Sequence, residues 1–217
     1  MADTTGEGRS GGTEEWRVDD TPAPDVCADV LAAAFARESA TQWICHGSDV
    51  VRKRWFTVLL DTQATVAGSR RLLLTDGRGR ATGAAVLTPP GADPSAGAQA
   101  RWAARTLTLC GGRALTRTLR YLHRTESLAP PGAWTLEFIG VRPEAAGRGA
   151  GRLLLGRLLA TAPAPGGVFL TTADHANVAF YEGFGFTVLD RPRVGPLETT
   201  AMWRPPGPVR PEEPRPL

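Results

Sequence analysis

The chain has 217 residues, 42% of them hydrophobic, which is enough for one globular core without disulfides or metals. Its 25 basic and 22 acidic residues give a net charge of +3 and are scattered along the sequence, which argues against nucleic-acid binding. Cys27, Cys45 and Cys110 lie far apart without metal-ligand spacing, so we expect neither a disulfide framework nor a zinc site, but reduced and buried thiols in a cytoplasmic protein.

The chain begins with a polar segment. Residues 1–14 are rich in Gly, Thr, Ser and charge, and they lack the basic and apolar regions of a signal peptide. We predict a disordered tail there. No later stretch approaches 18 continuous apolar residues, so we expect no membrane-spanning segment.

The first half of the folded part is predicted to hold a strand, two helices and a hairpin. Val30, Leu31 and Ala34 recur at helical spacing. Asp76, Gly77 and Gly79 separate two apolar runs and supply the freedom for a tight turn. The predicted elements are a strand at 16–18, helices at 25–37 and 50–65, and hairpin strands at 71–76 and 81–88.

The second half alternates strands and helices. A strand, a helix and a further strand in succession indicate a parallel crossover, and the hairpins before it make the sheet a mixed one. Residues 205–217 are proline-rich and are predicted as a second disordered tail, so the folded domain is expected at 15–204. The predicted elements are helices at 99–109, 114–122, 152–159 and 177–182, and strands at 134–141, 168–172, 186–189 and 199–203.

A glycine-rich turn, AGRGAG at 146–151, follows a predicted strand and opens a helix. Unpaired backbone N–H groups converge there at the positive end of the helix dipole, and the glycines let the main chain approach a pyrophosphate closely. The GxGxxG pattern fails because position 152 is arginine, and GxxxxGK[ST] fails for want of lysine and hydroxyl. The turn therefore indicates an anion site, although a loop that only reverses the chain fits the same letters.

The string LEFIGVRPEAAGRGAGRLLL at 136–155 resembles the acetyl-CoA motif of N-acetyltransferases of the GNAT superfamily: V-x-P, then Q/R-x-x-G-x-G/A, then an apolar helix. Ala146 departs from the usual Gln or Arg. The resemblance implies a GNAT fold, a mixed and mostly antiparallel sheet whose backbone at Ile139, Gly140 and Val141 pairs with the pantetheine arm of acetyl-CoA. It also implies a local bulge that splays two strands. The implied phosphate contacts are Ala146, Gly147, Arg148, Gly149, Ala150, Gly151 and Arg152.

A second motif lies at 177–186, NVAFYEGFGF. Asn177 and Tyr181 are four apart on one predicted helix and share a face. The run resembles the C-terminal signature of the same superfamily, which implies that Asn177, Phe180 and Tyr181 contact acetyl-CoA. Tyr181 is then the expected general acid for the departing thiolate. Outside this signature, a tyrosine with a satisfied hydroxyl in the core would be the ordinary interpretation.

Acetyl transfer to an amine needs a base, because free amines are largely protonated at neutral pH. Strand alternation places Glu137 on one face with Ile139 and Val141, and the resemblance puts it at the base position of many GNAT enzymes. A carboxylate in so apolar a strand is costly unless it is used. The alternative is a salt-bridged or solvated strand residue.

Glu38 is the rival base. The segment LAAAFARESAT at 31–41 resembles the first helix and loop of the puromycin N-acetyltransferase group, in which a tyrosine implicated in deprotonation stands at the position of Glu38. The likeness continues in WTLEFIGVRP and FYEGFGFTVLD and suggests an antibiotic or another natural product as substrate, hence a role in antibiotic resistance. The alternative for Glu38 is a solvated helix end.

Three tryptophans, Trp43, Trp55 and Trp102, fall where GNAT folds form the acceptor site and are predicted to stack on the substrate, although each alone is more typical of packing. The histidines receive no catalytic role. We therefore expect a small-molecule N-acetyltransferase, a monomer or homodimer that uses acetyl-CoA and no metal. The alternatives are acetylation of a protein or peptide and a non-catalytic acyl-CoA sensor.

Overall fold

The computed structural model describes residues 15–161 and 165–207. The predicted tail at 1–14 and most of the predicted tail at 205–217 lie outside these ranges, while residues 205–207 are exposed and irregular. A sheet with the strand order β1-β2-β3-β4-β5-β9-β6 forms the centre of the fold. Only β4 and β5 are parallel in it, so the predicted mixed, mostly antiparallel α/β fold is confirmed.

The strands follow the sequence prediction closely. The strands of the main sheet are β1 Arg17–Asp19, β2 Arg70–Thr75, β3 Ala81–Thr88, β4 Trp134–Val141, β5 Val168–Thr172, β6 Thr187–Asp190 and β9 Thr200–Arg204. A separate hairpin of β7 Arg193–Val194 and β8 Leu197–Glu198 was not predicted, because two-residue strands leave no alternation to detect.

The helices also match, with two differences. They are α1 Pro24–Ala34, α2 Ser39–Cys45, α3 Asp49–Gln63, α4 Ala96–Cys110, α5 Gly112–Thr125, α6 Ala150–Thr161 and α7 Ala176–Glu182, with 3-10 turns η1 Glu126–Leu128 and η2 Pro143–Ala145. The predicted helix 25–37 ends three residues early, and α2 was not predicted. A turn at Phe35 ends α1, and Glu38 then takes an extended conformation and caps the new helix α2.

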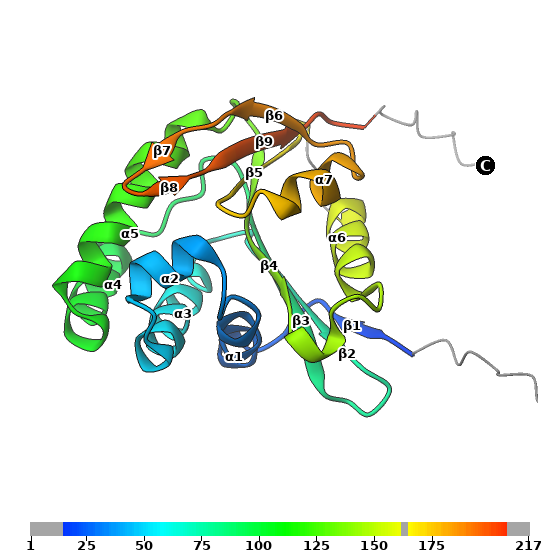
Figure 1. Cartoon of the computed structure of the whole chain (residues 1–217), viewed down its shortest axis with the longest axis horizontal. Coiled ribbons are helices and arrows are strands. Elements are labelled where there is room, and N and C mark those ends of the chain that lie inside the picture. The colour runs from blue at the N-terminus through cyan, green and yellow to red at the C-terminus, as the bar shows by residue number, and fades with distance from the viewer. Residues whose placement is uncertain (1–14, 162–164, 208–217) are drawn as a thin grey trace, which may run out of the picture.

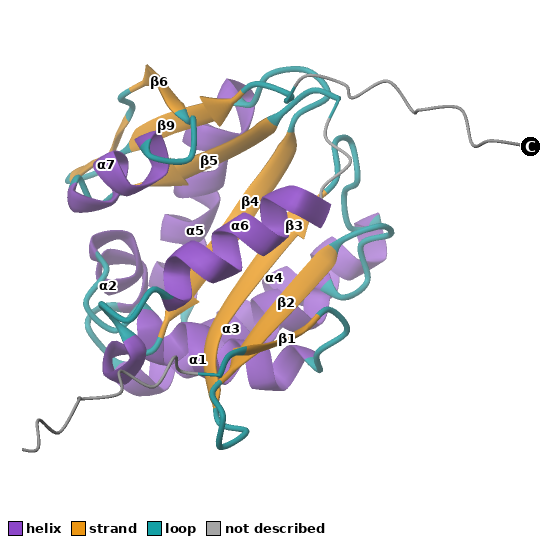
Figure 2. Ribbon diagram, turned by 90° about the vertical axis from the view of Figure 1, so that its right-hand side faces the viewer, coloured by secondary structure: helices purple, strands orange, loops and turns teal. Residues whose placement is uncertain are grey.

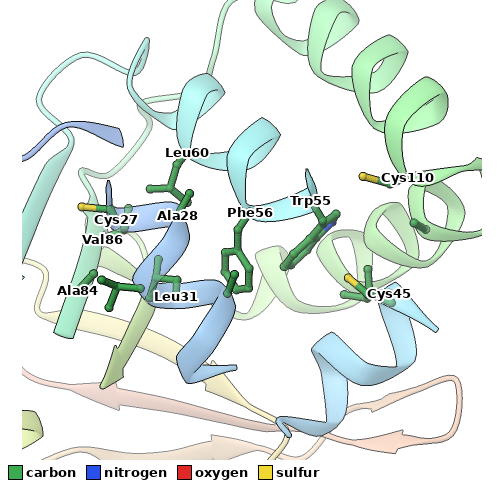
Figure 3. Packing of buried hydrophobic residues seen from close by; sticks show 14 of the residues in the cluster. Cys27, Ala28, Leu31, Cys45, Trp55, Phe56, Leu60, Ala84, Val86 and Cys110 are labelled. Carbon is green, nitrogen blue, oxygen red and sulfur yellow. The ribbon is translucent and has the colours of Figure 1, made fainter. Parts of the chain in front are cut away.

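The sheet separates two groups of helices (Figure 1). One group packs α1 and α3 on side chains of β2 and β3 that include Leu73, Ala84 and Val86, and Figure 3 shows part of this cluster. The alternate strand positions Leu72 and Leu74 face α6 on the other side (Figure 2). The strand pleat therefore gives the sheet a core on each face.

The parallel pair β4 and β5 separates after three residues. Its register runs from Trp134 opposite Val168 to Leu136 opposite Leu170, and β4 continues alone on that side from Glu137 (Figure 2). On the other side, Val86 pairs with Phe138 and Leu87 with Leu136, so Glu137 is the extra residue of a β-bulge. The splay that the resemblance implied is present, and the bulge lies at Glu137 rather than at 139–141.

Gly140 permits α1 to approach β4. A Cβ atom placed there would lie 2.7 Å from the Ala34 Cβ and 2.9 Å from the Phe35 Cε2. We expect Gly140→Ala to lower the free energy of unfolding by about 1–3 kcal/mol, because overpacking must displace the helix. Denaturant unfolding measures the change.

Gly156→Ala is the matched control, since a Cβ atom at Gly156 meets nothing within 4 Å and the position is interior to α6. It should stabilise the protein by about 0.5–1 kcal/mol. Equal midpoints for Gly140→Ala and the wild type would contradict the close helix contact.

Candidate active site

A cavity of about 600 Å³ opens where β4 and β5 separate. Its wall comes from α2, α3, α5 and α7, the end of α1, the splayed strands and the loop after β3. The cavity is lined by six of the site residues predicted from the sequence: Glu38, Trp55, Glu137, Ile139, Asn177 and Tyr181. Segments from both halves of the chain thus meet around one space.

The bulged residue Glu137 lines this cavity. Solvent reaches its side chain from the cavity, while protein surrounds it on the other sides. Desolvation by these surroundings raises the pKa of Glu137 to about 7; a hydrogen bond from Thr88 partly offsets the rise, and the Glu126 carboxylate adds to it. A carboxyl group that titrates near neutrality can take a proton from an ammonium group and release it again.

Tyr181 enters the cavity from α7 and is only 8% exposed. Its ring packs against Phe180 and Phe186 at centroid distances of 5.4 and 5.7 Å. Burial, then the negative charges of Glu38 and Asp174, raise the pKa of its phenol well above the usual range. Within the described residues its hydroxyl has no hydrogen-bond partner, so a protonated donor faces the cavity.

Glu38 is occupied as a helix cap. Its Oε1 accepts from the backbone N–H of Ala40 at 3.0 Å, and its Oε2 accepts from that of Thr41 at 2.7 Å. Both carboxylate oxygens therefore stabilise the start of α2, although the residue also lines the cavity. This arrangement makes Glu38 a poorer candidate base than Glu137.

Tyr121 is a cavity residue that the sequence interpretation missed. Its hydroxyl lies 3.0 Å from Thr171 Oγ1, and burial, partly offset by this hydrogen bond, raises its pKa to about 12. Glu38 adds a smaller upward effect. Helical spacing in the sequence could have identified Tyr121. Four side chains of α5 that recur at intervals of three and four line the cavity, namely Thr118, Tyr121, Leu122 and Thr125.

The three predicted stacking tryptophans occupy different places. Trp55 lines the cavity, and its Nε1 donates to Thr118 Oγ1 at 2.9 Å. Trp43 lies outside it under the Arg117 guanidinium, 5.1 Å from the ring centroid, and Trp102 does not line it. Of the three predicted tryptophans, Trp55 is the one on the cavity wall.

No cysteine or histidine lines the cavity among the described residues. All three cysteines are free and buried, and burial raises the pKa of Cys45 to about 12. His175 lies beside Glu198 at 3.7 Å, and Asp174 Oδ1 accepts from the Ala176 N–H at 3.0 Å in the turn before α7. A thiolate nucleophile has no place in this site.

The glycine-rich turn is exposed beside the free edge of β4. Gly147 and Gly149 have φ values of +76° and +83°, and a Cβ atom at either would meet nothing within 4 Å. The glycines therefore serve the left-handed conformation and leave open space beside the backbone. The Leu153 N–H donates to Gly149 at 3.0 Å, so the preceding amides form the open end of α6. This cradle fits a pyrophosphate.

The remaining predicted cofactor contacts gather around this turn. Phe180 and Val141 flank Gly151 at 3.8 Å from a Cβ built there, and the Arg152 guanidinium lies 5.9 Å from the Phe184 ring centroid. Among residues 15–161 and 165–207, no group of three His, Cys, Asp or Glu side chains could hold a metal ion. None of the helices described is long and apolar enough to cross a membrane.

The comparisons with known proteins agree with this geometry. The sequence model of the Acetyltransferase (GNAT) family matches residues 99–186, which contain both motifs. No curated protein matches the chain significantly.

Solved structures share the fold at low identity. A Corynebacterium glutamicum protein described as histone acetyltransferase HPA2 and related acetyltransferase has a TM-score of 0.61 and 22% identity over 88% of this chain and 97% of its own. A phosphinothricin acetyltransferase from Sinorhizobium meliloti in complex with AcCoA has a TM-score of 0.52 and 17% identity over 90% and 89%. The ribosomal-protein-S18-alanine N-acetyltransferase from Escherichia coli has a TM-score of 0.51 and 17% identity over 88% and 94%.

The chain has the GNAT fold, and the match of residues 99–186 to the family model supports an N-acetyltransferase enzyme. Enzymes of this type use acetyl-CoA, and the Sinorhizobium meliloti neighbour contains it.

Proposed function

We propose that residues 15–204 form the catalytic domain of an acetyl-CoA-dependent N-acetyltransferase that acts on the amine of a small molecule. The observation that carries the proposal is the cavity of about 600 Å³ that holds both Glu137 and Tyr181. This volume lies in the range of small-molecule sites. The weak likeness to the puromycin group favours a natural-product amine, and with it a cytoplasmic role in antibiotic resistance or tailoring.

The cofactor site that we propose uses the cradle and the free strand edge. The backbone from Gly147 to Arg152 would hold the pyrophosphate at the positive end of α6. Ala146 supplies no polar side chain. The unpaired edge of β4 at 139–141 would hold the pantetheine arm, with Asn177 and Phe180 on the facing helix.

The chemistry follows from the two titratable groups. Acetyl-CoA, when bound, supplies the thioester. Glu137 accepts the proton of the ammonium group, so that a neutral amine attacks and a C–N bond replaces the C–S bond. A backbone N–H near Ile139 polarises the carbonyl oxygen, and Tyr181 donates its proton toward the leaving sulfur. Transfer is direct, and Glu38 keeps its capping role.

Protein or peptide acetylation is the second candidate. The names of the Corynebacterium glutamicum and Escherichia coli neighbours refer to such substrates, but at 22% and 17% identity these neighbours share only the fold with this chain. A peptide needs an open groove, whereas the space here is bounded by helices from several sides. A sensor, the third candidate, needs neither a carboxyl group whose pKa lies near 7 nor an unpaired phenol in its ligand cavity.

A panel of acceptors tests the proposal. Thiol release from acetyl-CoA should be seen with one or more of puromycin, aminoglycosides, polyamines and arylamines, and mass spectrometry should find the matching N-acetyl product. Peptides with free N-termini or lysines should be poorer acceptors by kcat/KM. Acetylation of peptides alone would favour the protein-directed alternative, and CoA binding without turnover would favour the sensor.

A further inference from the structure

The charged side chains that line the cavity are all acidic. The chain has more basic than acidic residues, yet the described residues that line the cavity include no Lys, Arg or His. Four carboxylates line it, namely Glu38, Asp93, Glu126 and Glu137. A wall of this kind attracts cations and repels anions.

Three of these carboxylates are close enough to act on one another electrostatically. Desolvation and then the neighbouring Asp93 raise the pKa of Glu126, while His123 lowers it, and Glu126 in turn acts on Glu137. Asp93 belongs to the loop after β3 and Glu126 begins η1 after α5. All three residues are exposed; the loop with Asp93 and the turn with Glu126 form the side of the cavity that we call its mouth, whereas Glu137 lies at the splayed strands.

The cavity also has polar groups without partners. Thr41 is 3% exposed and Tyr181 is 8% exposed, and both line the space. Neither hydroxyl has a hydrogen-bond partner among residues 15–161 and 165–207. Neither hydroxyl oxygen is among the fully buried atoms without a partner, so both are accessible from the cavity and can hydrogen-bond to a polar ligand there. Phe35, Trp55 and Leu59 supply an apolar stretch of the wall.

We propose, building on the function proposed above, that the acceptor carries two positively charged groups. The nitrogen that is acetylated lies at Glu137, and a second ammonium or guanidinium group binds Asp93 and Glu126 at the mouth. An apolar spacer connects them along the wall. Acceptors with a distal carboxylate or phosphate are rejected, because the wall has no cation to pair with them.

Three acceptors of equal chain length test the inference: hexylamine, hexamethylenediamine and aminohexanoate, whose distal ends are neutral, positive and negative. With wild-type enzyme, kcat/KM should be about tenfold higher for the diamine than for the monoamine, and lowest for the amino acid. The double variant Asp93→Asn, Glu126→Gln should remove the diamine preference through KM. Asp20→Asn combined with Asp29→Asn removes two exposed carboxylates outside the cavity; this pair is the charge-matched control and should keep the preference.

Equilibrium binding of the same three compounds to the protein with CoA separates the two proposals. A diamine preference that the double variant abolishes supports the inference, even if no compound is acetylated and the proposed function fails. Turnover or binding that ranks the three compounds equally overturns the inference and leaves the proposed function standing. A preference that survives in the double variant also overturns it.

Discussion

Glu137→Gln should lower kcat by about 10²–10⁴-fold, because the amide cannot accept a proton from the ammonium group. The wild-type profile of kcat/KM against pH should rise through an apparent pKa near 7, the value to which burial raises this carboxyl. Glu137 acts as a base only when it is deprotonated, so kcat/KM falls as the pH drops below 7. This fall is the acidic limb of the profile. Steady-state thiol release across the pH range measures both effects, and the variant should lack this acidic limb.

Glu38→Gln is the matched control for that experiment. It removes the rival carboxylate and weakens a cap, so it should cost about 1 kcal/mol in the free energy of unfolding. Its acidic limb should remain, with kcat within a few-fold of wild type. The opposite pattern, in which Glu38→Gln abolishes the limb and Glu137→Gln preserves it, would make Glu38 the base.

Tyr181→Phe should lower kcat by about 10²-fold while the affinity for CoA stays near that of the wild type. The phenol and the Asn177 amide are the polar groups that α7 presents to the cavity, and the raised pKa of the phenol keeps it protonated and able to donate to the sulfur. Phenylalanine retains the ring contacts with Phe180 and Phe186, so the core should be unaffected. Single-turnover kinetics and CoA titration separate the two quantities.

The other tyrosine of the chain provides the control. Tyr121→Phe removes a hydroxyl that is hydrogen-bonded to Thr171 on the cavity wall. It should change KM for the amine more than kcat. Equal kcat losses in the two variants would contradict a specific acid role for Tyr181.

The sequence predicts the part of the fold that local patterns control. The bounds of β4 agree residue for residue with the prediction, because an apolar run ends at a proline and a glycine-rich turn. The motif around 146–152 also identifies the strand, turn and helix that build the cradle. These features depend on residues adjacent in sequence.

Features set by tertiary contacts were not predictable in the same way. The bulge at Glu137 depends on how β4 pairs with β3, and simple alternation cannot show it. The early end of α1 depends on the turn at Phe35, and the start of α2 depends on Glu38 as an unusual cap. Asp93, Glu126 and Tyr121 reach the cavity from separate segments, so only the fold brings them together.

The most direct test of the central claim is a mass balance during a single turnover. Enzyme in excess is mixed with acetyl-CoA and an accepted amine, and thiol, N-acetyl amine and intact protein mass are followed together. Direct transfer at Glu137 and Tyr181 predicts equal amounts of thiol and N-acetyl amine, with the protein mass unchanged throughout. An acetylated protein that forms first and then passes its acetyl group to the amine would contradict the account.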